Sequence, residues 1–296
     1  MPINNQIMIQ ALPAFIFLTA LEAYVLTREH RNPETKQNAM VSLGLGIIFT
    51  VSAFISKGLL FVVYSWLYQF RIIDITHFSW WVWALCFVGD DFSYYWFHRC
   101  SHSIRYLWAC HLVHHSSETY NLMAAFRNSF FAQLNGSFIF WCWLPIVGFR
   151  PDIIIFAKTM STIYQFLLHT EVIHKFPAWF EYIFNTPSHH RVHHGSNEEY
   201  LDKNHGGWLI IFDRILGTYL DESFHPTYGL TKKIPGNNPV YINVAEYISI
   251  YSDLKKVRGF RNYWKCIFGP PSWKPEESSI KAKYRKTENH NLMTAA

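Results

Sequence analysis

The 296-residue sequence is poor in cysteine and in charged residues, and it lacks several motifs that mark common enzymes. Its five cysteines are scattered and form no C-x-x-C pair, so they indicate neither a disulfide framework nor a zinc finger. It has no glycine-rich phosphate loop, no nucleophile elbow and no His-Glu-x-x-His motif. These absences argue against a P-loop nucleotide enzyme, an α/β-hydrolase and a zinc protease of the His-Glu-x-x-His type.

Long apolar segments are abundant instead. Half of the residues are apolar and 18% are aromatic, whereas only 16% are charged. Five segments each approach or exceed the roughly 20 residues that a helix needs to cross a bilayer, and Trp and Tyr lie near their ends; they are residues 6–26, 40–70, 78–97, 130–149 and 151–170. We therefore expect an all-α polytopic membrane protein with about five membrane-embedded segments, rather than buried helices of a soluble protein. Lys57 suggests that residues 40–70 form a bent or re-entrant pair.

The basic residues predict an orientation in the membrane. Lys and Arg are more frequent in 27–39, in 98–129 and after residue 170 than in the connections between them. Since residues 6–26 lack the features of a cleaved signal peptide, we expect a retained anchor with the N-terminus outside. The histidine clusters and the C-terminus would then be cytoplasmic, at the endoplasmic reticulum or the bacterial inner membrane. We expect a membrane domain over 1–268, with a cytoplasmic helical cap that carries the histidine clusters, and a flexible, basic cytoplasmic tail over 269–296.

Histidines form an array in the second half of this domain. Of sixteen histidines, twelve lie between His98 and His205, in the motifs HRCSH, HLVHH, HTEVIH and HHRVHH. Residues three and four apart share a helix face, so each motif is expected to present its imidazoles together, with His189 out of phase. The candidate metal ligands are His98, His102, His111, His114, His115, His169, His190, His193 and His194. Whether His174 or His205 also touches metal stays open.

Ligand type and number narrow the choice of metal. Imidazole suits iron, zinc, copper and nickel, but a zinc site closes with about four ligands, so this many histidines indicate two ions in one pocket. Soluble di-iron bundles carry two Glu-x-x-His motifs, and this chain has one, Glu171 to His174. His169 and Glu171 match the His-x-Glu of zinc deaminases, but the Pro-Cys-x-x-Cys that should follow is absent.

In that order, HRCSH, HLVHH and HHRVHH resemble the histidine boxes of the fatty acid hydroxylase superfamily. The resemblance covers about residues 85–220 and is closest to the alkylglycerol monooxygenase branch and its bacterial sterol-desaturase-like relatives. The matching stretches are DFSYYWFHR (91–99), LWACHLVHHSSETYNL (107–122), LHTEVI (168–173), NTPSHHRVHHG (185–195) and DKNHGGWLIIFDRILGTY (202–219). Two departures are Ser103, where that branch carries Glu, and His205, where the pattern usually has Tyr.

The resemblance implies a membrane enzyme with a di-iron centre that uses molecular oxygen to hydroxylate a lipid. The branch implies an ether lipid such as an alkylglycerol; the alternatives are hydroxylation or desaturation of a sterol, fatty acyl, sphingoid or carotenoid chain. Because no His-Pro-Gly-Gly haem motif is present, electrons must come from a separate donor, tetrahydrobiopterin or a small cytochrome or ferredoxin. No nucleic-acid partner is expected. The non-enzymatic alternative is a histidine-rich, metal-handling membrane protein.

Polar residues near the histidine motifs are candidates for holding the ligands in place. Asp91, Tyr95, His98 and His102 follow one helix stripe, so Asp91 is expected to orient an imidazole or to pair with Arg99 or Arg127. The candidates of this kind are Asp91, Tyr95, Glu118, Asn121, Asn185, Asp202 and Asn204. Residues 208–212 are expected to lie in the membrane interface or to form a packed cap, and residues 241–257 to form a further cap helix.

Overall fold

The computed structural model describes residues 3–28, 36–75 and 79–275. Within these ranges the regular structure is helical, apart from two isolated bridges between Phe184 and Leu209 and between Gly195 and Tyr228. The predicted all-α class is therefore confirmed. The α-helices are α1 (Ile3–Arg28), α2 (Lys36–Tyr68), α3 (Trp80–Ser103), α4 (Arg105–His111), α5 (Trp143–Val147), α6 (Pro151–Leu168), α7 (Ala178–Ile183), α8 (Pro187–His194), α9 (Ile211–Leu216), α10 (Pro239–Leu254) and α11 (Phe260–Phe268). The short 3-10 helices are η1 (His114–Ser116), η2 (Ala124–Phe126), η3 (Phe130–Gln133), η4 (Ser137–Trp141) and η5 (Glu198–Tyr200).

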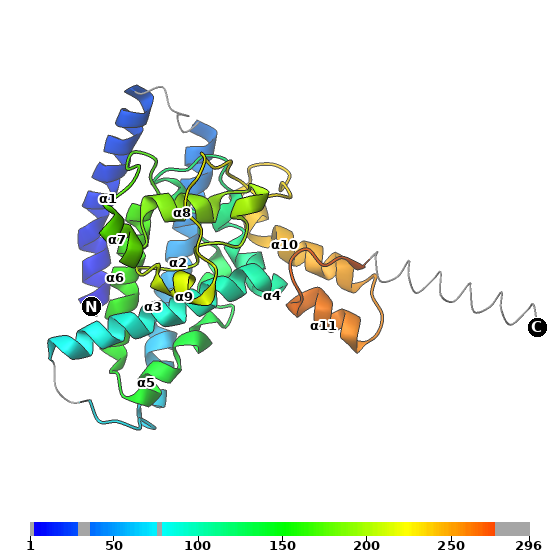
Figure 1. The fold of residues 1–296 in the computed structure, drawn as a ribbon. Helices are drawn as coiled ribbons and strands as arrows, with labels where there is room; N and C mark the ends of the chain where they lie inside the picture. Colours follow the sequence, from blue (N-terminus) through cyan, green and yellow to red (C-terminus); the bar gives the residue numbers. More distant parts are fainter. Residues whose placement is uncertain (1–2, 29–35, 76–78, 276–296) are drawn as a thin grey trace, which may run out of the picture.

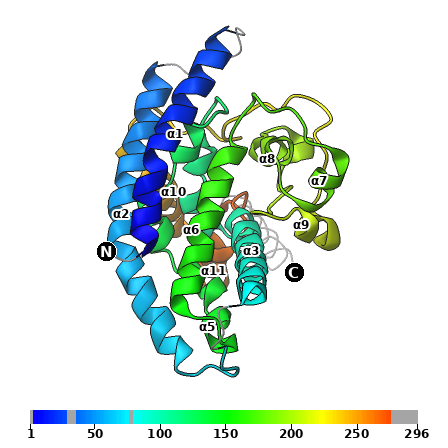
Figure 2. The ribbon, with the colours of Figure 1, turned by 90° about the vertical axis from the view of Figure 1, so that its left-hand side faces the viewer.

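Two long helices form one side of the molecule. Figure 2 shows α1, α2 and α6 running side by side, with α7, α8 and α9 gathered on the other side of α6. α3 runs across the direction of α1 and α2 (Figure 1) and packs on α6. The short helices that carry histidine motifs are thus held against α3 and α6.

Among the described helices, α1 has the length and composition to cross a membrane over Gln10–Arg28. α2 is a second candidate only if its two parts, Lys36–Ala53 and Gly58–Tyr68, are one span with a 42° bend between them. This bend agrees with the expectation for residues 40–70. The outer faces of both helices carry exposed apolar side chains, among them Leu12, Ile16, Phe17, Leu21, Met40, Ile47 and Val62.

The predicted count of five spanning segments is not supported. Residues 130–149 do not form a single long helix: they divide into η3, η4 and α5, and Ser137–Val147 is apolar but shorter than a span, so this predicted segment is not confirmed. Gly136 interrupts the segment because it adopts a left-handed conformation, with φ of 83°, between η3 and η4. α3 and α6 coincide with the predicted segments 78–97 and 151–170, but neither combines the length with the apolar composition of a membrane-spanning helix.

Two buried clusters set the positions of the helices around the histidines. One joins α2, α3, α5 and α6 through residues such as Tyr64, Cys86, Leu144 and Ile154. A second joins α2, α10 and the turn after α4 through Val41, Leu45, Leu112, Val113 and Ile242, and Trp108 of α4 packs against it. The core therefore fixes α3, α4 and α6, the elements that carry or adjoin the first histidine motifs.

The C-terminal part largely follows the sequence expectations. α10 occupies most of the predicted cap helix at 241–257, and Asn238 caps it by accepting hydrogen bonds from the Val240 and Tyr241 backbone amides. Trp208 stacks on Tyr164 of α6, with ring centroids 4.4 Å apart, which supports a packed cap at 208–212. Of the predicted tail, residues 269–275 are described, and the Gly269 carbonyl accepts the Arg105 amide; residues 276–296 lie outside the described residues.

Candidate metal centre

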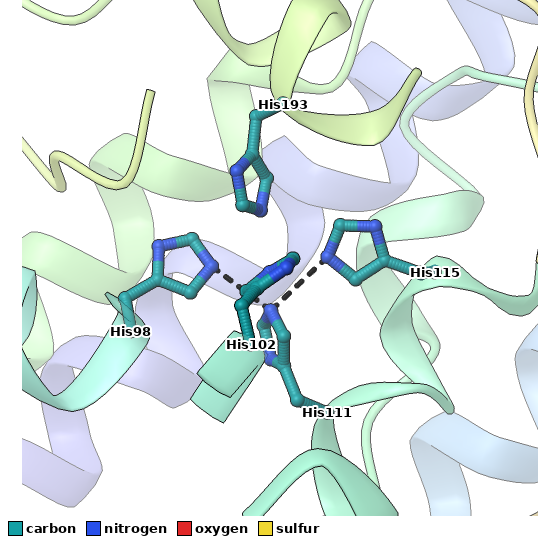
Figure 3. Close-up of side chains that lie close together, drawn as sticks. All are labelled: His98, His102, His111, His115 and His193. Carbon is teal, nitrogen blue, oxygen red and sulfur yellow. Dashed lines mark hydrogen bonds between the residues drawn. The ribbon is translucent and has the colours of Figure 1, made fainter. Parts of the chain in front are cut away.

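The nine histidines predicted as ligands come together in two groups. His98, His102, His111, His115 and His193 form the first group (Figure 3), and His114, His169, His190 and His194 form the second group. Within each group, one ring nitrogen of every histidine lies within 4.8 Å of the others. Seven of the nine side chains are buried, and His111 and His114 are half-buried. Four segments distant in sequence therefore converge on one polar centre.

Two of the motifs divide between the groups, which corrects the expectation that each motif presents its histidines together. α4 ends at His111, and the chain then turns before η1 begins at His114, so HLVHH is not one continuous α-helix. His111 consequently joins the first group and His114 the second. α8 is one continuous helix, but its neighbouring residues His193 and His194 point in directions about 100° apart around the helix axis. His193 thus faces the first group, and His194 faces the second.

Hydrogen bonds to carbonyl groups determine which ring nitrogens face the first group. The Nδ1 atoms of His98 and His193 lie 2.8 and 2.9 Å from the carbonyl oxygens of His205 and Lys203. A carbonyl oxygen only accepts, so Nδ1 carries the proton in both rings, and in a neutral ring Nε2 is left with a lone pair. The Nε2 atoms of His193 and His102 are buried and have no hydrogen-bond partner.

In the second group, two ring nitrogens that both carry lone pairs face each other. His114 Nδ1 donates to the Arg127 carbonyl at 3.2 Å, and His169 Nδ1 donates to the Gln165 carbonyl at 2.8 Å. Their Nε2 atoms nevertheless lie 3.1 Å apart. Two neutral rings with protonated Nδ1 cannot form a hydrogen bond there, because both facing nitrogens are acceptors. A cation bound between the two nitrogens would remove this conflict.

Burial and the neighbouring imidazoles keep these rings neutral, and a histidine must be neutral to bind a metal ion. Burial lowers the pKa of His114 to about 4. Burial, together with the neighbouring imidazoles, also holds the pKa of His193 and of His194 well below the ordinary value of histidine. The neutral rings present lone pairs to the centre at neutral pH.

The spacing fits metal ions. Ring nitrogens that bind one ion at about 2.1 Å and at right angles to each other lie about 3 Å apart. The observed Nε2 separations are 2.9 Å for His98 and His111, 3.1 Å for His111 and His115, and 3.2 Å for His190 and His194. The groups adjoin, since the rings of His115 and His194 stack with centroids 4.4 Å apart. The donor set therefore fits two ions in one pocket.

Between His98 and His205, three further histidines lie outside both groups. His189 is buried, but its Nδ1 lies 3.3 Å from the Thr186 hydroxyl and its ring packs against Tyr219, as its phase in the motif predicted. His174 is exposed, and its carbonyl accepts a hydrogen bond from Arg191. His205 packs beside the rings of the first group and contributes its carbonyl to His98 rather than a ring nitrogen.

Of the polar residues expected near the ligands, Asp202 contacts an imidazole. Its Oδ1 lies 3.2 Å from His102 Nδ1, and this hydrogen bond lowers the pKa of the Asp202 carboxyl. Asp202 adopts a left-handed backbone conformation with φ of 58°. Asp202 therefore orients a predicted ligand directly.

Other candidates hold the backbone that carries the ligands. The Asn204 amide donates to the His189 carbonyl at 3.1 Å, and the Asn185 amide donates to the Gly206 carbonyl at 2.6 Å. Asp91 was expected to bind an imidazole or an arginine, but its carboxylate accepts the Trp208 and Leu209 amides at 2.6 and 2.9 Å. The reason is position: Asp91 lies two turns before His98 on α3, level with the 206–209 loop.

The remaining candidates lie farther from the centre. Tyr95 hydrogen-bonds Thr218 at 2.9 Å, and Asn121 accepts the Ala124 amide at 3.1 Å. Glu118 is exposed and pairs with Lys233 at 2.7 Å, so the expectation that it supports the ligands is wrong. The chain turns outward after η1, which carries Glu118 to the surface.

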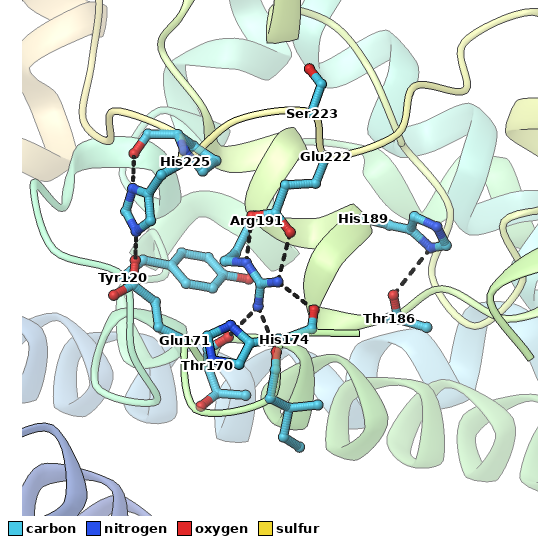
Figure 4. Close-up of polar contacts among 12 residues, drawn as sticks. Tyr120, Thr170, Glu171, His174, Thr186, His189, Arg191, Glu222, Ser223 and His225 are labelled. Carbon is cyan, nitrogen blue, oxygen red and sulfur yellow. Dashed lines mark hydrogen bonds and ion pairs between the residues drawn. The ribbon is translucent and has the colours of Figure 1, made fainter. Parts of the chain in front are cut away.

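Some supporting residues had no recognisable signal in the sequence. The carbonyls of Gln165, Arg127, Lys203 and His205 hold four Nδ1 atoms, and a backbone acceptor cannot be recognised from residue type. Asp213 accepts the amides of His205 and Gly206, each at 2.7 Å, and so fixes the loop that reaches His98. The sequence shows Arg191 as a charged residue inside HHRVHH, but it does not indicate that the side chain is buried and bonded to Glu222 (Figure 4).

A buried carboxylate ties α1 to the second group. Glu22 is only 6% exposed, and its Oε1 accepts the Thr170 hydroxyl at 2.5 Å while its Oε2 accepts the Leu122 amide at 2.6 Å. Thr170 directly follows His169 in the chain. A carboxylate in an apolar helix is costly and usually has a specific partner. α1 is thus joined to the loop that presents His169.

Replacing Glu22 by alanine is expected to lower the free energy of unfolding by about 2 kcal/mol or more, because it leaves a buried hydroxyl and a buried amide unpaired. Thr27→Ala is the matched control: Thr27 is exposed on the same helix and bonds the Ala23 carbonyl one turn away. Denaturant unfolding in detergent micelles measures both variants. Equal stability of the two variants would show that the Glu22 contacts contribute nothing.

The comparisons with known proteins agree with this geometry. The sequence profile described as "Fatty acid hydroxylase" matches residues 83–218. The chain is 37% identical to alkylglycerol monooxygenase of Homo sapiens over 268 residues, which cover 90% of this chain and 60% of the human protein. It is 36% identical to alkylglycerol monooxygenase of Xenopus tropicalis over 262 residues, 88% of this chain and 58% of that protein.

A more distant similarity is to an ornithine lipid hydroxylase of Rhizobium tropici, 27% identical over 136 residues that cover 46% of this chain and 41% of that protein. No solved structure matches the chain. The chain spans about six tenths of the length of the vertebrate relatives. The predicted resemblance over residues 85–220 is confirmed, since residues 83–218 match the fatty acid hydroxylase profile.

Proposed function

We propose that the chain is a membrane-bound, oxygen-dependent lipid monooxygenase with two iron ions. The observation that supports it most is the convergence of nine buried or half-buried imidazoles in two adjoining groups. In the second group, the lone pairs of His114 and His169 face each other 3.1 Å apart, an arrangement that a cation would stabilise. The relatives whose names describe monooxygenases acting on alkylglycerols support the reaction class.

The histidines of the first group would hold one ion and those of the second group the other. Bound iron would supply the activation of molecular oxygen that hydroxylation of an unactivated C–H bond requires. The chain's own contribution is to fix the donors: the His205 and Lys203 carbonyls set the tautomers of His98 and His193, and Asp202 orients His102. Burial excludes water and keeps the rings neutral.

An ether lipid such as an alkylglycerol is the proposed substrate. Hydroxylation of the carbon beside the ether oxygen gives a hemiacetal, which collapses to a fatty aldehyde and a glycerol derivative. Membranes containing the chain, supplied with an alkylglycerol, oxygen and either reduced tetrahydrobiopterin or a reduced ferredoxin system, are expected to form fatty aldehyde. The His194→Ala chain is the control for non-enzymatic oxidation. Turnover of a sterol or carotenoid, with alkylglycerol untouched with every donor, would contradict the substrate and leave the metal chemistry intact.

The proposed orientation places the N-terminus outside and the histidine groups at the cytoplasmic side, because the basic segments alternate in that way. Exposed positions on the two sides test it. A cysteine introduced at Glu199 is expected to react with a membrane-impermeant reagent only from the cytoplasmic face, and one at Ile72 only from the opposite face. The unaltered chain gives the background from its native cysteines. Labelling of both positions from one face would reject this topology.

A further inference from the structure

The outward face of α11 is aromatic. Phe260, Trp264 and Phe268 follow one another at four-residue spacing and are 81%, 55% and 42% exposed. Their rings form a continuous row, with centroids 6.2 Å apart for the first pair and 4.5 Å apart for the second. On the other side of α11, Cys266 is fully buried, and its thiol lies 3.7 Å from the Ile250 carbonyl of α10. The packing against α10 therefore turns the aromatic row outward.

The same surface is strongly basic. The fourteen residues from Lys255 to Phe268 contain no Asp or Glu, and the basic residues among them are Lys255, Lys256, Arg258, Arg261 and Lys265, all exposed. Asp253, which precedes them, lies 2.9 Å from the buried guanidinium of Arg105 and 3.4 Å from Lys256, so it offsets part of the charge of Lys256 but not that of the other four basic residues. The net charge of this segment is positive and its aromatic side chains lie among the cationic ones.

Apolar exposure continues onto α10, where Ile248 and Tyr251 are 50% and 61% exposed. The Lys255 ammonium lies 4.1 Å from the centre of the Tyr251 ring. In Figure 1, α10 and α11 project from the body on the side away from α1. The aromatic and basic surface formed by Ile248, Tyr251 and the exposed side chains of residues 255–268 therefore lies away from the exposed apolar side chains of α1.

We propose that this surface, the α10–α11 surface, is a second membrane attachment that binds the interface of an anionic lipid bilayer. Aromatic rings favour the headgroup level, while Lys and Arg extend to anionic headgroups along their aliphatic stems. The combination of exposed aromatic and basic residues is the composition of interfacial helices. A second copy of the chain fits less well, because a symmetric contact would bring the same five cationic side chains against their equivalents.

Because it needs a bilayer, this role rests on the proposed membrane location but not on the metal chemistry. A spin label on Trp264→Cys reports it, in the full chain with Cys100 and Cys142 replaced by serine. The chain is placed in nanodiscs of phosphatidylcholine alone, or of phosphatidylcholine mixed with phosphatidylserine. We expect the label in the mixed discs to collide with oxygen several-fold more, relative to a water-soluble nickel complex, than a label on exposed Glu199→Cys.

Charge reversal tests the contribution of the basic residues. Arg261→Glu with Lys265→Glu is expected to remove the difference between the two lipid compositions and to return the label to water. Lys36→Glu with Lys175→Glu changes the net charge equally at exposed positions on other elements and is expected to change nothing.

Three results would overturn the assignment. The label at 264 could be as accessible to nickel as the label at 199 in both lipids. It could be shielded equally from both probes whatever the lipid, which would mean that protein covers the surface. Finally, a label on Ile16→Cys, an exposed position of α1, could also show no preference for oxygen; that result would remove the membrane location itself, on which the assignment rests.

Discussion

Replacing His194 by alanine is expected to remove metal from the second group and to lower lipid turnover by more than about 100-fold. Mutation of a residue that only orients a metal ligand already lowers metal affinity or activity by about 10–100-fold, and loss of a ligand should cost more. His194 is one of four histidines in that group, and its Nε2 lies 3.2 Å from that of His190. It also stacks on His115 of the first group, so its loss disturbs the boundary between the two proposed ions.

The matched control is His189→Ala, five residues earlier on the same helix. His189 is buried like His194, but its Nδ1 faces the Thr186 hydroxyl rather than the centre. We expect this variant to keep its metal, even if the smaller side chain costs stability. Metal content per folded chain, measured together with aldehyde formation, separates the two effects. Full metal occupancy in His194→Ala would refute the proposed ligand set.

Replacing Arg191 by methionine is expected to cost about 3–5 kcal/mol of unfolding free energy, the usual penalty for breaking a buried ion pair from one side. Arg191 is 4% exposed and holds Glu222 through two hydrogen bonds of 2.8 and 2.7 Å (Figure 4). It also donates to the carbonyls of Thr170, Ile173 and His174 at 3.0, 2.7 and 2.6 Å. One guanidinium thus joins α8, the 170–174 loop and the segment at Glu222.

Arg150→Ala provides the comparison. Arg150 forms a similar two-bond pair with Asp152, but both side chains are 40–50% exposed, so its loss should cost at most about 1 kcal/mol. Arg191→Lys should fall between the two, because an ammonium keeps the charge but not the planar fork. Denaturant unfolding gives all three values. A cost for Arg191→Met no greater than that for Arg150→Ala would mean that the clamp does not stabilise the fold.

Sequence spacing predicted which histidines come together better than it predicted how they divide into two groups. HRCSH lies on the continuous helix α3, so helical phase places His98 and His102 together correctly. HLVHH crosses the end of α4, and no single residue there predicts that the helix ends at His111. Which histidines share a group therefore depends on where α4 ends and on the different directions in which neighbouring side chains of α8 point, and tertiary packing determines both.

The membrane segments and the supporting residues show the limits of composition. Residues 130–149 are apolar enough to suggest a span, yet the left-handed Gly136 separates two short helices. Asp91 has the position of a ligand-orienting carboxylate but binds backbone amides, because a loop more than one hundred residues away packs against it. Such contacts between distant segments cannot be recognised from local pattern.

The metal content of the purified chain tests the central claim most directly. Elemental analysis of the chain, isolated aerobically from cells supplied with iron, zinc and copper, is combined with Mössbauer spectroscopy and with oxygen consumption in the presence of lipid and reductant. Two irons per chain with the spectrum of a coupled pair, and oxygen consumption that needs the lipid, are the predicted result. A single zinc per chain with no oxygen consumption would contradict the di-iron monooxygenase and favour a metal-handling protein.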